Sequence, residues 1–142
     1  MLTTTPLHTT PSASSERYQR GWDMLKTIDG EAGERVIASL QDLAPDLARY
    51  IIEFGFGDIY SRGVLTLKER EIATVAALTS MGTAQPQLKV HLHGALNVGC
   101  SREEVTEVLI QMAVYAGFPA ALNGLFALQQ VLAERASNDA VR

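Results

Sequence analysis

Apolar residues recur every three to four positions from about residue 16 to residue 136 of this 142-residue chain. This spacing places them along one side of a helix. No segment alternates apolar and polar residues between turn signals, which is the pattern typical of a β-strand. The pattern therefore predicts an all-α protein with one helical domain over residues 16–136.

Helix starts are marked most clearly in the second half of the chain. Thr66 and Ser101 each begin an S/T-x-x-E sequence, the capping box that satisfies free backbone N–H groups at a helix start. They predict helices over Leu67–Met81 and Arg102–Ala116. Weaker signals predict the other helices over residues 16–28, 31–40, 45–54, 86–99 and 119–135, with an irregular, glycine-interrupted stretch between residues 55 and 63.

The ends of the chain differ in composition from this domain. Residues 1–15 contain no Asp, Glu, Lys or Arg and are mostly Thr, Ser and Pro. Such a segment buries too little apolar surface to become ordered. We expect a disordered tail over residues 1–15 and a frayed tail over residues 137–142.

The helix predicted over Arg102–Ala116 is apolar on almost every side. A helix of this kind has to be covered. Either it is the central helix of a single bundle, or a neighbouring subunit covers it. In a chain of this length we favour a homo-oligomer.

Composition narrows the class of partner and the cellular setting. Twelve Lys and Arg stand against sixteen Asp and Glu, without a basic run that would bind phosphates, so nucleic acid is not an expected partner. No apolar run is long enough to cross a membrane. The N-terminus lacks the features of a secretory signal, so we expect a cytoplasmic protein. The one cysteine, Cys100, is expected to be an inert thiol.

Glu71 is a carboxylate on an apolar helix stripe that it shares with Leu67, Val75 and Leu78. Burial disfavours the charged form of a carboxyl group, which can make it a proton donor or acceptor near neutral pH. The alternative is a structural role, in which Glu71 bonds a buried backbone group or an arginine.

His91 has the same character, because Leu88, Leu92 and Ala95 share its helix face. A catalytic imidazole and a core histidine with satisfied hydrogen bonds both fit this position. His93 lies about 200° further round the helix and faces away. This geometry argues against a shared metal ion, since helical ligands to one metal are three or four residues apart. We expect neither a metal nor a cofactor.

The helices that carry Glu71 and His91 should run antiparallel across a short turn. At 1.5 Å per residue, the two side chains come out roughly 7 Å apart along the helix axis. The register therefore predicts that they line one cavity, and that a direct hydrogen bond requires an inclined crossing or an intervening group.

Further polar candidates lie outside this pair. Glu107, Gln111 and Tyr115 form a line at four-residue spacing on the apolar helix. The line is either a solvated face or a set of groups that orients a polar ligand in a pocket or across a subunit contact. Arg62 and Lys89 are candidates to bind an acidic group. We favour Arg62, whose segment DIYSRGVL contains apolar anchors.

Three segments together resemble a known family: RYQRGWDML, FGDIYSRGVLTLKEREIATVAAL and PQLKVHLHGALNVGCSREEVTEVLIQMAVYAGFPAALNGL. They are similar to the carboxymuconolactone decarboxylase family, part of the alkylhydroperoxidase D-like superfamily, over about residues 17–134. The resemblance implies an alkylhydroperoxidase D-like multi-helix bundle that assembles into trimers or hexamers. For the namesake enzymes it implies cofactor-free decarboxylation of gamma-carboxymuconolactone, an acidic lactone from the breakdown of aromatic compounds.

The resemblance also implies roles for individual residues. Redox members of the superfamily carry C-x-x-C-x-x-x-H, with a glutamate one helix earlier. Here the histidine is His91, the glutamate is best matched by Glu71, and Ala84 and Gln87 stand at the two cysteine positions. Thiol peroxidase chemistry therefore lacks its nucleophile. His93 stands where decarboxylases often have arginine, which bears on the substrate that is recognised.

Together these observations lead to one expectation and two alternatives. We expect a cofactor-independent decarboxylase acting on a small acidic organic substrate, with His91 and Glu71 as its catalytic pair. The first alternative is a proton-transfer enzyme or isomerase that acts on another small carbonyl compound. The second is a non-catalytic oligomeric ligand-binding protein, in which the pair only satisfies its own hydrogen bonds. The residues expected to bind the substrate are Arg62, His93, Gln111 and Tyr115.

Overall fold

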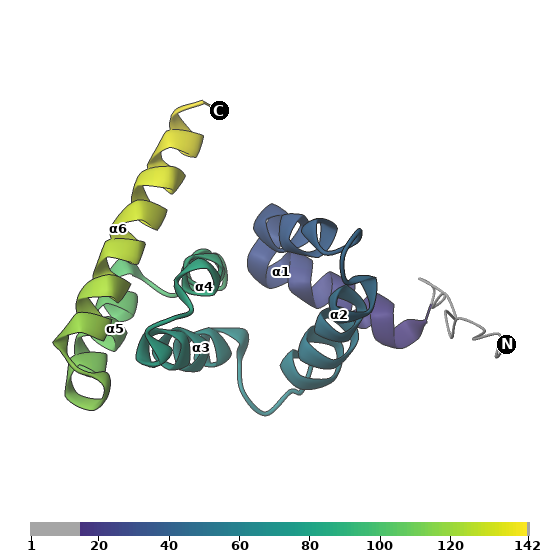
Figure 1. Ribbon diagram of the computed structural model, residues 1–142, viewed down its shortest axis with the longest axis horizontal. Coiled ribbons are helices and arrows are strands. Elements are labelled where there is room, and N and C mark those ends of the chain that lie inside the picture. Colours follow the sequence, from purple (N-terminus) through teal and green to yellow (C-terminus); the bar gives the residue numbers. More distant parts are fainter. Residues whose placement is uncertain (1–14, 142) are drawn as a thin grey trace, which may run out of the picture.

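The structure is a computed structural model that describes residues 15–141, and every regular element in this range is helical. In chain order the elements are α1 (Glu16–Ser39), α2 (Pro45–Tyr50), η1 (Ile51–Tyr60), α3 (Leu67–Met81), α4 (Gln85–Asn97), α5 (Arg102–Ala116) and α6 (Phe118–Ala140). Figure 1 shows α1 and α2 on one side, α5 and α6 on the other, and α3 and α4 between them. The all-α prediction is confirmed.

Both predicted capping boxes are present. The Thr66 side chain accepts a hydrogen bond from the Glu69 backbone, and the Glu69 side chain bonds the Thr66 backbone in return. Ser101 makes the same exchange at the start of α5. Helices α3 and α5 have the predicted bounds, because these local bonds fix their first turns without help from the rest of the fold.

The first two predicted helices are both present and together make up α1. The backbone turns between them at Gly30, whose φ of 55° and ψ of −140° are not helical. Only glycine adopts this conformation without strain, which explains why the sequence pattern breaks there. The tail predicted over residues 1–15 lies outside the described residues, except for Ser15. Its side chain caps α1 by accepting a hydrogen bond from the Tyr18 backbone.

The segment after Pro45 was predicted only in part: a helix begins at Pro45 as expected, but its continuation differs. In place of a helix over residues 45–54 and an irregular stretch, α2 ends at Tyr50 and a π-helix, η1, follows directly. A π-helix usually lasts only one turn because its geometry is poor. Contacts with the rest of the fold therefore have to stabilise η1, and a local sequence pattern does not report them.

Helix α1 supplies that contact through a close backbone approach. A Cβ atom on Gly21 would lie 1.9 Å from the carbonyl oxygen of Ile52, and one on Gly57 would lie 2.8 Å from that of Arg17. Neither position has room for a side chain. The absence of side chains here lets α1 and η1 touch backbone to backbone.

At the other end of the chain, α6 continues to Ala140, well beyond the predicted end at residue 135. Residues 137–140 belong to this helix, and Ser137 donates a hydrogen bond to the carbonyl of Ala133; a frayed end from residue 137 stays a prediction. No helix between residues 15 and 141 is both long and apolar enough to cross a membrane.

Two apolar clusters form the core. One joins α3, α4, α5 and α6, and the other joins α1, α2 and η1. Helix α4 packs against α1 as well as against α3 and α6, so it connects the two clusters. Side chains on α1, α3 and α4 therefore meet where the clusters join, and the candidate site lies there.

Replacing Gly21 with alanine should disrupt the contact between α1 and η1. Because the new methyl group would overlap the Ile52 carbonyl, we expect Gly21→Ala to lower the free energy of unfolding by about 3 kcal/mol or more. Chemical denaturation measures this. The matched control is Gly55→Ala, since nothing lies within 4 Å of a Cβ there; it should change stability by less than about 1 kcal/mol. Equal losses in the two variants would refute the close contact.

Candidate active site

Glu71 and His91 bond each other directly. The Nδ1 atom of His91 lies 3.1 Å from Oε2 and 3.3 Å from Oε1 of Glu71. The Glu71 side chain is fully buried on α3, whereas that of His91 on α4 is 20% exposed. The offset of roughly 7 Å expected from helix register does not separate them, because register along the axis omits the reach of the side chains and the crossing of the helices.

This contact controls the protonation of His91. Burial alone would lower the pKa of the imidazole, but the hydrogen bond and negative charge of Glu71 outweigh burial, and the pKa is raised. The charge of Asp29 adds to the increase. Since carboxylate oxygens only accept, Nδ1 carries the proton in this bond, and Nε2 is left for other partners.

Asp29 on α1 is a third ionisable group at the site, and the sequence analysis did not identify it. Its side chain is buried, and Oδ1 has no hydrogen-bond partner. Burial raises the pKa of Asp29 to about 6, with His91 opposing this increase and Glu71 adding to it. The helical pattern gave no signal for it, because residue 29 falls between the helices predicted over residues 16–28 and 31–40.

Gly94 allows the two carboxyl groups to approach each other. A Cβ atom at this position would lie 2.8 Å from Asp29 Oδ1 and 3.1 Å from Glu71 Oε2. Any larger residue would therefore push at least one carboxyl group away. The backbone of α4 thus brings the carboxyl groups of α1 and α3 to one place, and His91 stands one helical turn earlier on α4.

A cavity of about 260 Å³ opens beside this cluster. Its polar lining comes from Asp29, His91 and Gln87, and the rest is apolar or glycine. Glu71 does not line the cavity but lies behind His91. The volume suits a small ring-containing molecule. The other lining residues are Leu25, Gly33, Val36, Ile37, Ile51, Phe56, Pro86 and Val90.

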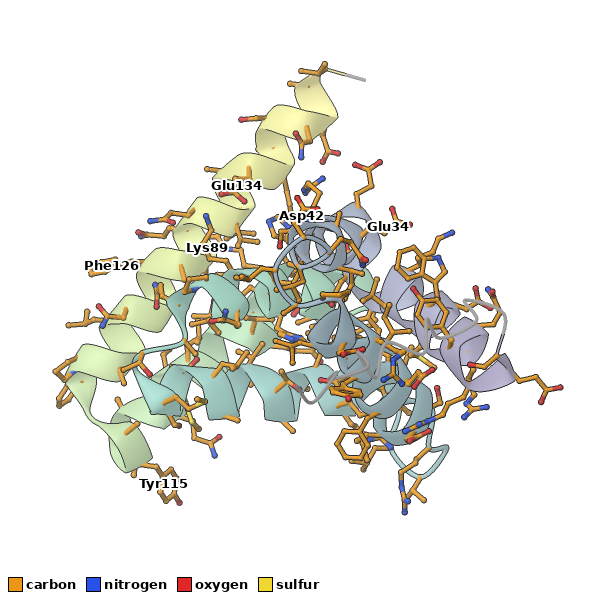
Figure 2. All side chains as sticks on the ribbon, turned by 45° about the vertical axis from the view of Figure 1, so that its right-hand side comes forward. Glu34, Asp42, Lys89, Tyr115, Phe126 and Glu134 are labelled. Carbon is orange, nitrogen blue, oxygen red and sulfur yellow. The ribbon has the colours of Figure 1, made fainter. Side chains whose placement is uncertain are left out.

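A second, more open groove of about 700 Å³ lies between α1 and the end of α6. Asp29 also lines this groove, together with His93 and Glu134. The Nε2 atom of His93 lies 2.9 Å from Glu134, which also accepts a hydrogen bond from Lys89 at 2.7 Å. Figure 2 shows Lys89 and Glu134 close together between α4 and α6. His93 therefore faces the groove and not the cavity.

The other residues predicted to bind substrate lie away from the pair. Arg62 is exposed in the loop after η1, and Gln111 and Tyr115 are exposed on α5. Figure 2 shows Tyr115 extending outward at the end of α5. None of the three lines the cavity or the groove. A role for them in binding stays a prediction, and a single subunit brings only Glu71 and His91 together.

Tyr60 and Thr74 also surround Glu71. The Tyr60 hydroxyl bonds that of Thr74. Burial raises the pKa of Tyr60 to about 12, and the negative charge of Glu71 contributes. Tyr60 therefore stays a neutral phenol beside the carboxylate. Its position could not be predicted, because it depends on the path of η1.

Cys100 is buried, and burial raises the pKa of its thiol. The thiolate is the nucleophilic form, so this environment suppresses reactivity. Within residues 15–141, no group of three or more His, Cys, Asp or Glu side chains is arranged to hold a metal ion.

Comparison with known proteins gives consistent matches. The chain matches the carboxymuconolactone decarboxylase family over residues 45–130. It is 28% identical over 117 residues to 4-carboxymuconolactone decarboxylase of Acinetobacter baylyi, covering 82% of this chain and 87% of that protein. It is 30% identical over 120 residues to an uncharacterized 15.0 kDa protein of Paracoccus denitrificans, covering 84% and 90%. A nitrosuccinic acid decarboxylase of Metarhizium robertsii is 28% identical over 82 residues, covering 58% and 57%.

The family match includes the helices that form the pair. Residues 45–130 contain both Glu71 and His91, whereas Asp29 lies outside this range. The match covers more than half of the chain, and the described helices agree with the alkylhydroperoxidase D-like fold that the family implies. The resemblance inferred from the sequence segments is confirmed: this chain belongs to the carboxymuconolactone decarboxylase family.

Proposed function

We propose that this protein is a cofactor-independent decarboxylase of the carboxymuconolactone type, acting on an acidic lactone from the breakdown of aromatic compounds. The observation that carries the proposal is the bond between His91 and the buried Glu71 beside a small cavity. An imidazole held by a carboxylate is a suitable general acid. The names of two relatives, a 4-carboxymuconolactone decarboxylase and a nitrosuccinic acid decarboxylase, support chemistry of this class.

The reaction requires a place for an electron pair and then a proton. When the carbon–carbon bond to the carboxylate breaks, its electron pair spreads through the ring double bond onto the lactone carbonyl oxygen. Carbon dioxide leaves, and a proton is then added to carbon. Protonated His91 stabilises the developing negative charge and supplies the proton, while Glu71 stabilises the imidazolium before transfer.

The walls of the cavity support this step. Most of its lining is apolar, so little water competes for the developing charge. An apolar environment also favours expulsion of a charged carboxylate as neutral carbon dioxide. Gln87, which stands at one of the cysteine positions of the redox relatives, offers an amide that orients the ring.

One observation favours the first alternative, a proton-transfer enzyme or isomerase acting on another small carbonyl compound. Of the residues between 15 and 141, no lysine or arginine lines the cavity, and Arg62 is exposed elsewhere. His93 also replaces the arginine that decarboxylases often have. The second alternative, a non-catalytic oligomeric ligand-binding protein, would use the same cavity without proton transfer.

We also propose that the protein is a homo-oligomer, a trimer or hexamer as in its family, built through α5 and α6. Large apolar side chains are exposed on this face, and Figure 2 shows Phe126 extending outward from α6. An exposed patch of this kind marks a protein contact. A subunit contact here would also cover Gln111 and Tyr115, which gives them the ligand-orienting or interface position considered from the sequence. The exposed apolar residues are Ile110, Val114, Tyr115, Phe118, Leu122 and Phe126.

The catalytic pair is tested with gamma-carboxymuconolactone, by following loss of substrate and release of carbon dioxide. We expect His91→Asn to lower kcat about 100- to 10,000-fold, because the proton donor is lost. Wild-type activity should fall as pH rises through the pKa of His91, which lies above its usual 6.5. Glu71→Gln removes the charge that raises this pKa, so the fall should move to lower pH.

Glu103→Gln is the control for the catalytic pair, because Glu103 is an exposed carboxylate on α5; it should leave the rate and the pH profile unchanged. Activity of His91→Asn within a few-fold of wild type would show that another group is the acid. Absence of carbon dioxide release from folded wild-type protein would instead favour the proton-transfer alternative.

The oligomer is tested by placing a charge on the apolar face. Val114 is 77% exposed in the single chain, so Val114→Asp should not disturb the subunit itself. In an oligomer it buries an unpaired carboxylate, and we expect dissociation to smaller species in light scattering coupled to size-exclusion chromatography. Val64→Asp is the control, since Val64 is 86% exposed in the loop before α3. A wild-type monomer, or an unchanged mass for Val114→Asp, would contradict the proposed interface.

A further inference from the structure

Asp29 places a buried carboxyl group at the wall of the cavity. Its residue is 5% exposed, and Oδ1 is buried without a partner. An unpaired buried polar atom is costly, and most such atoms in folded proteins are paired. Because Asp29 lines the cavity, its carboxyl group can hydrogen-bond a molecule bound there, whereas Oδ1 itself lies against Gly94 of α4.

The surroundings of Asp29 favour its protonated form. The nearest ionisable groups are Glu71 from α3 and His91 from α4, and the positive charge of His91 is already bonded to Glu71. The carboxyl groups of Asp29 and Glu71 both lie close to Gly94. Two negative charges at this short separation repel each other, which disfavours ionisation of both groups. Burial, the largest cause, raises the pKa of Asp29 to about 6. From η1 the titratable neighbour is the neutral phenol Tyr60.

On the side of the open groove, the charges near Asp29 largely compensate one another. Arg35 forms an ion pair with Glu31 at 3.7 Å, both on α1. His93 from α4 bonds Glu134 from α6. These pairs leave no free cation to hold Asp29 in its charged form within the described groove.

We propose that Asp29 is a specificity-determining residue that selects a small carboxylate ligand: protonated Asp29 donates a hydrogen bond to the ligand carboxylate, so binding takes up one proton. The proposal rests on the proposed function in that it assigns an acidic molecule to the same cavity. It adds a group on α1, outside the family match, as the one that recognises the acid.

The chemistry of the cavity favours an anion over other ligands. An ionised Asp29 would repel a carboxylate, whereas a protonated carboxyl group donates to it in a charge-assisted hydrogen bond. The Nε2 atom of His91, free of the bond to Glu71, supplies a second donor. The apolar walls suit the ring of an aromatic or lactone acid. The polar groups of a neutral polar molecule would find no hydrogen-bond partners on these walls.

The sign of the pH dependence follows from the proton that Asp29 takes up when the ligand binds. In the empty protein Asp29 loses its proton near pH 6. An anion beside it raises that pKa further, so the complex holds a proton that the empty protein has lost. Binding should therefore weaken about fivefold from pH 6 to pH 7, and the decrease should approach tenfold for each unit of pH above pH 7.

The probe is 2-furoate, a small ring carboxylate that lacks the lactone carbonyl needed to accept the electrons left by carbon dioxide. It stays ionised across this pH range and does not react. Calorimetric titration at pH 7, in buffers with different enthalpies of ionisation, counts the protons taken up. We expect nearly one proton for wild-type protein and none for the neutral isostere 2-furamide.

Asp29→Asn should take up no proton with 2-furoate, and its affinity should change less than twofold between pH 6 and 7. Its amide still donates, so it should bind 2-furoate more tightly than wild type at pH 7.5. Asp23→Asn, an exposed position on the same helix, is the matched control and should behave as wild type. Thermal unfolding checks the fold of Asp29→Asn, whose Tm above pH 7 should equal or exceed that of wild type because an unpaired buried charge is gone.

The proposal is overturned by absence of 2-furoate binding at pH 5.5, by wild-type uptake well below one proton, or by uptake that persists in folded Asp29→Asn. The wild-type measurement decides even where the variant does not fold. Proton uptake without carbon dioxide release from gamma-carboxymuconolactone would support Asp29 and reject the decarboxylase. Carbon dioxide release without proton uptake would do the reverse.

Discussion

The site depends on one interaction, the bond between the fully buried carboxylate of Glu71 and the imidazole of His91. A carboxylate removed from water is strongly destabilised unless a partner compensates its charge. His91 is the cationic partner that the described residues supply at this position, and it joins α3 to α4. The same bond raises the pKa of the imidazole above its usual value. In the proposed reaction the structural and chemical roles of this pair coincide, because the bond that stabilises the buried charge also raises the pKa of the proposed acid.

Two glycines allow a close approach of helix backbones around Glu71 and His91. At Gly94 a side chain would occupy the space of the Asp29 and Glu71 carboxyl groups, and at Gly21 it would overlap η1. The first glycine places two carboxyl groups at one point, and the second fixes the π-helix that supplies Phe56 and Ile51 to the cavity wall. The contact at Gly94 lies where the two apolar clusters join, and the contact at Gly21 lies within the cluster of α1, α2 and η1. A shift between the clusters would alter the cavity and the ionisation of the site together.

The sequence predicted the features that depend on neighbouring residues. Capping boxes located α3 and α5, and a carboxylate on an apolar stripe identified Glu71. The sequence did not predict features that depend on contacts between distant residues. The π-helix η1 depends on packing against α1, and the direct bond of Glu71 to His91 depends on how α3 and α4 cross. Asp29 was not predicted, because it falls between the helices predicted over residues 16–28 and 31–40 and its burial depends on the packing of α1 against α4. The outward positions of Gln111 and Tyr115 follow from a helix that one subunit covers on only some sides.

The residues at the two positions that carry cysteines in the redox pattern of the superfamily bear on the chemistry of the site. Ala84 is buried and Gln87 lines the cavity, so neither position carries a thiol, while His91 and Glu71 bond each other. In the redox pattern a nearby base ionises the thiol nucleophile. Without the thiol, we propose that His91 moves protons to or from a ligand. Adding Asp29 to that base changes the charge of the site: two carboxyl groups share one imidazolium, so the site is negative when all three are ionised. An acidic ligand then binds only if the site first gains a proton, and the protonation of Asp29 becomes the point at which ligand charge and solution pH are coupled.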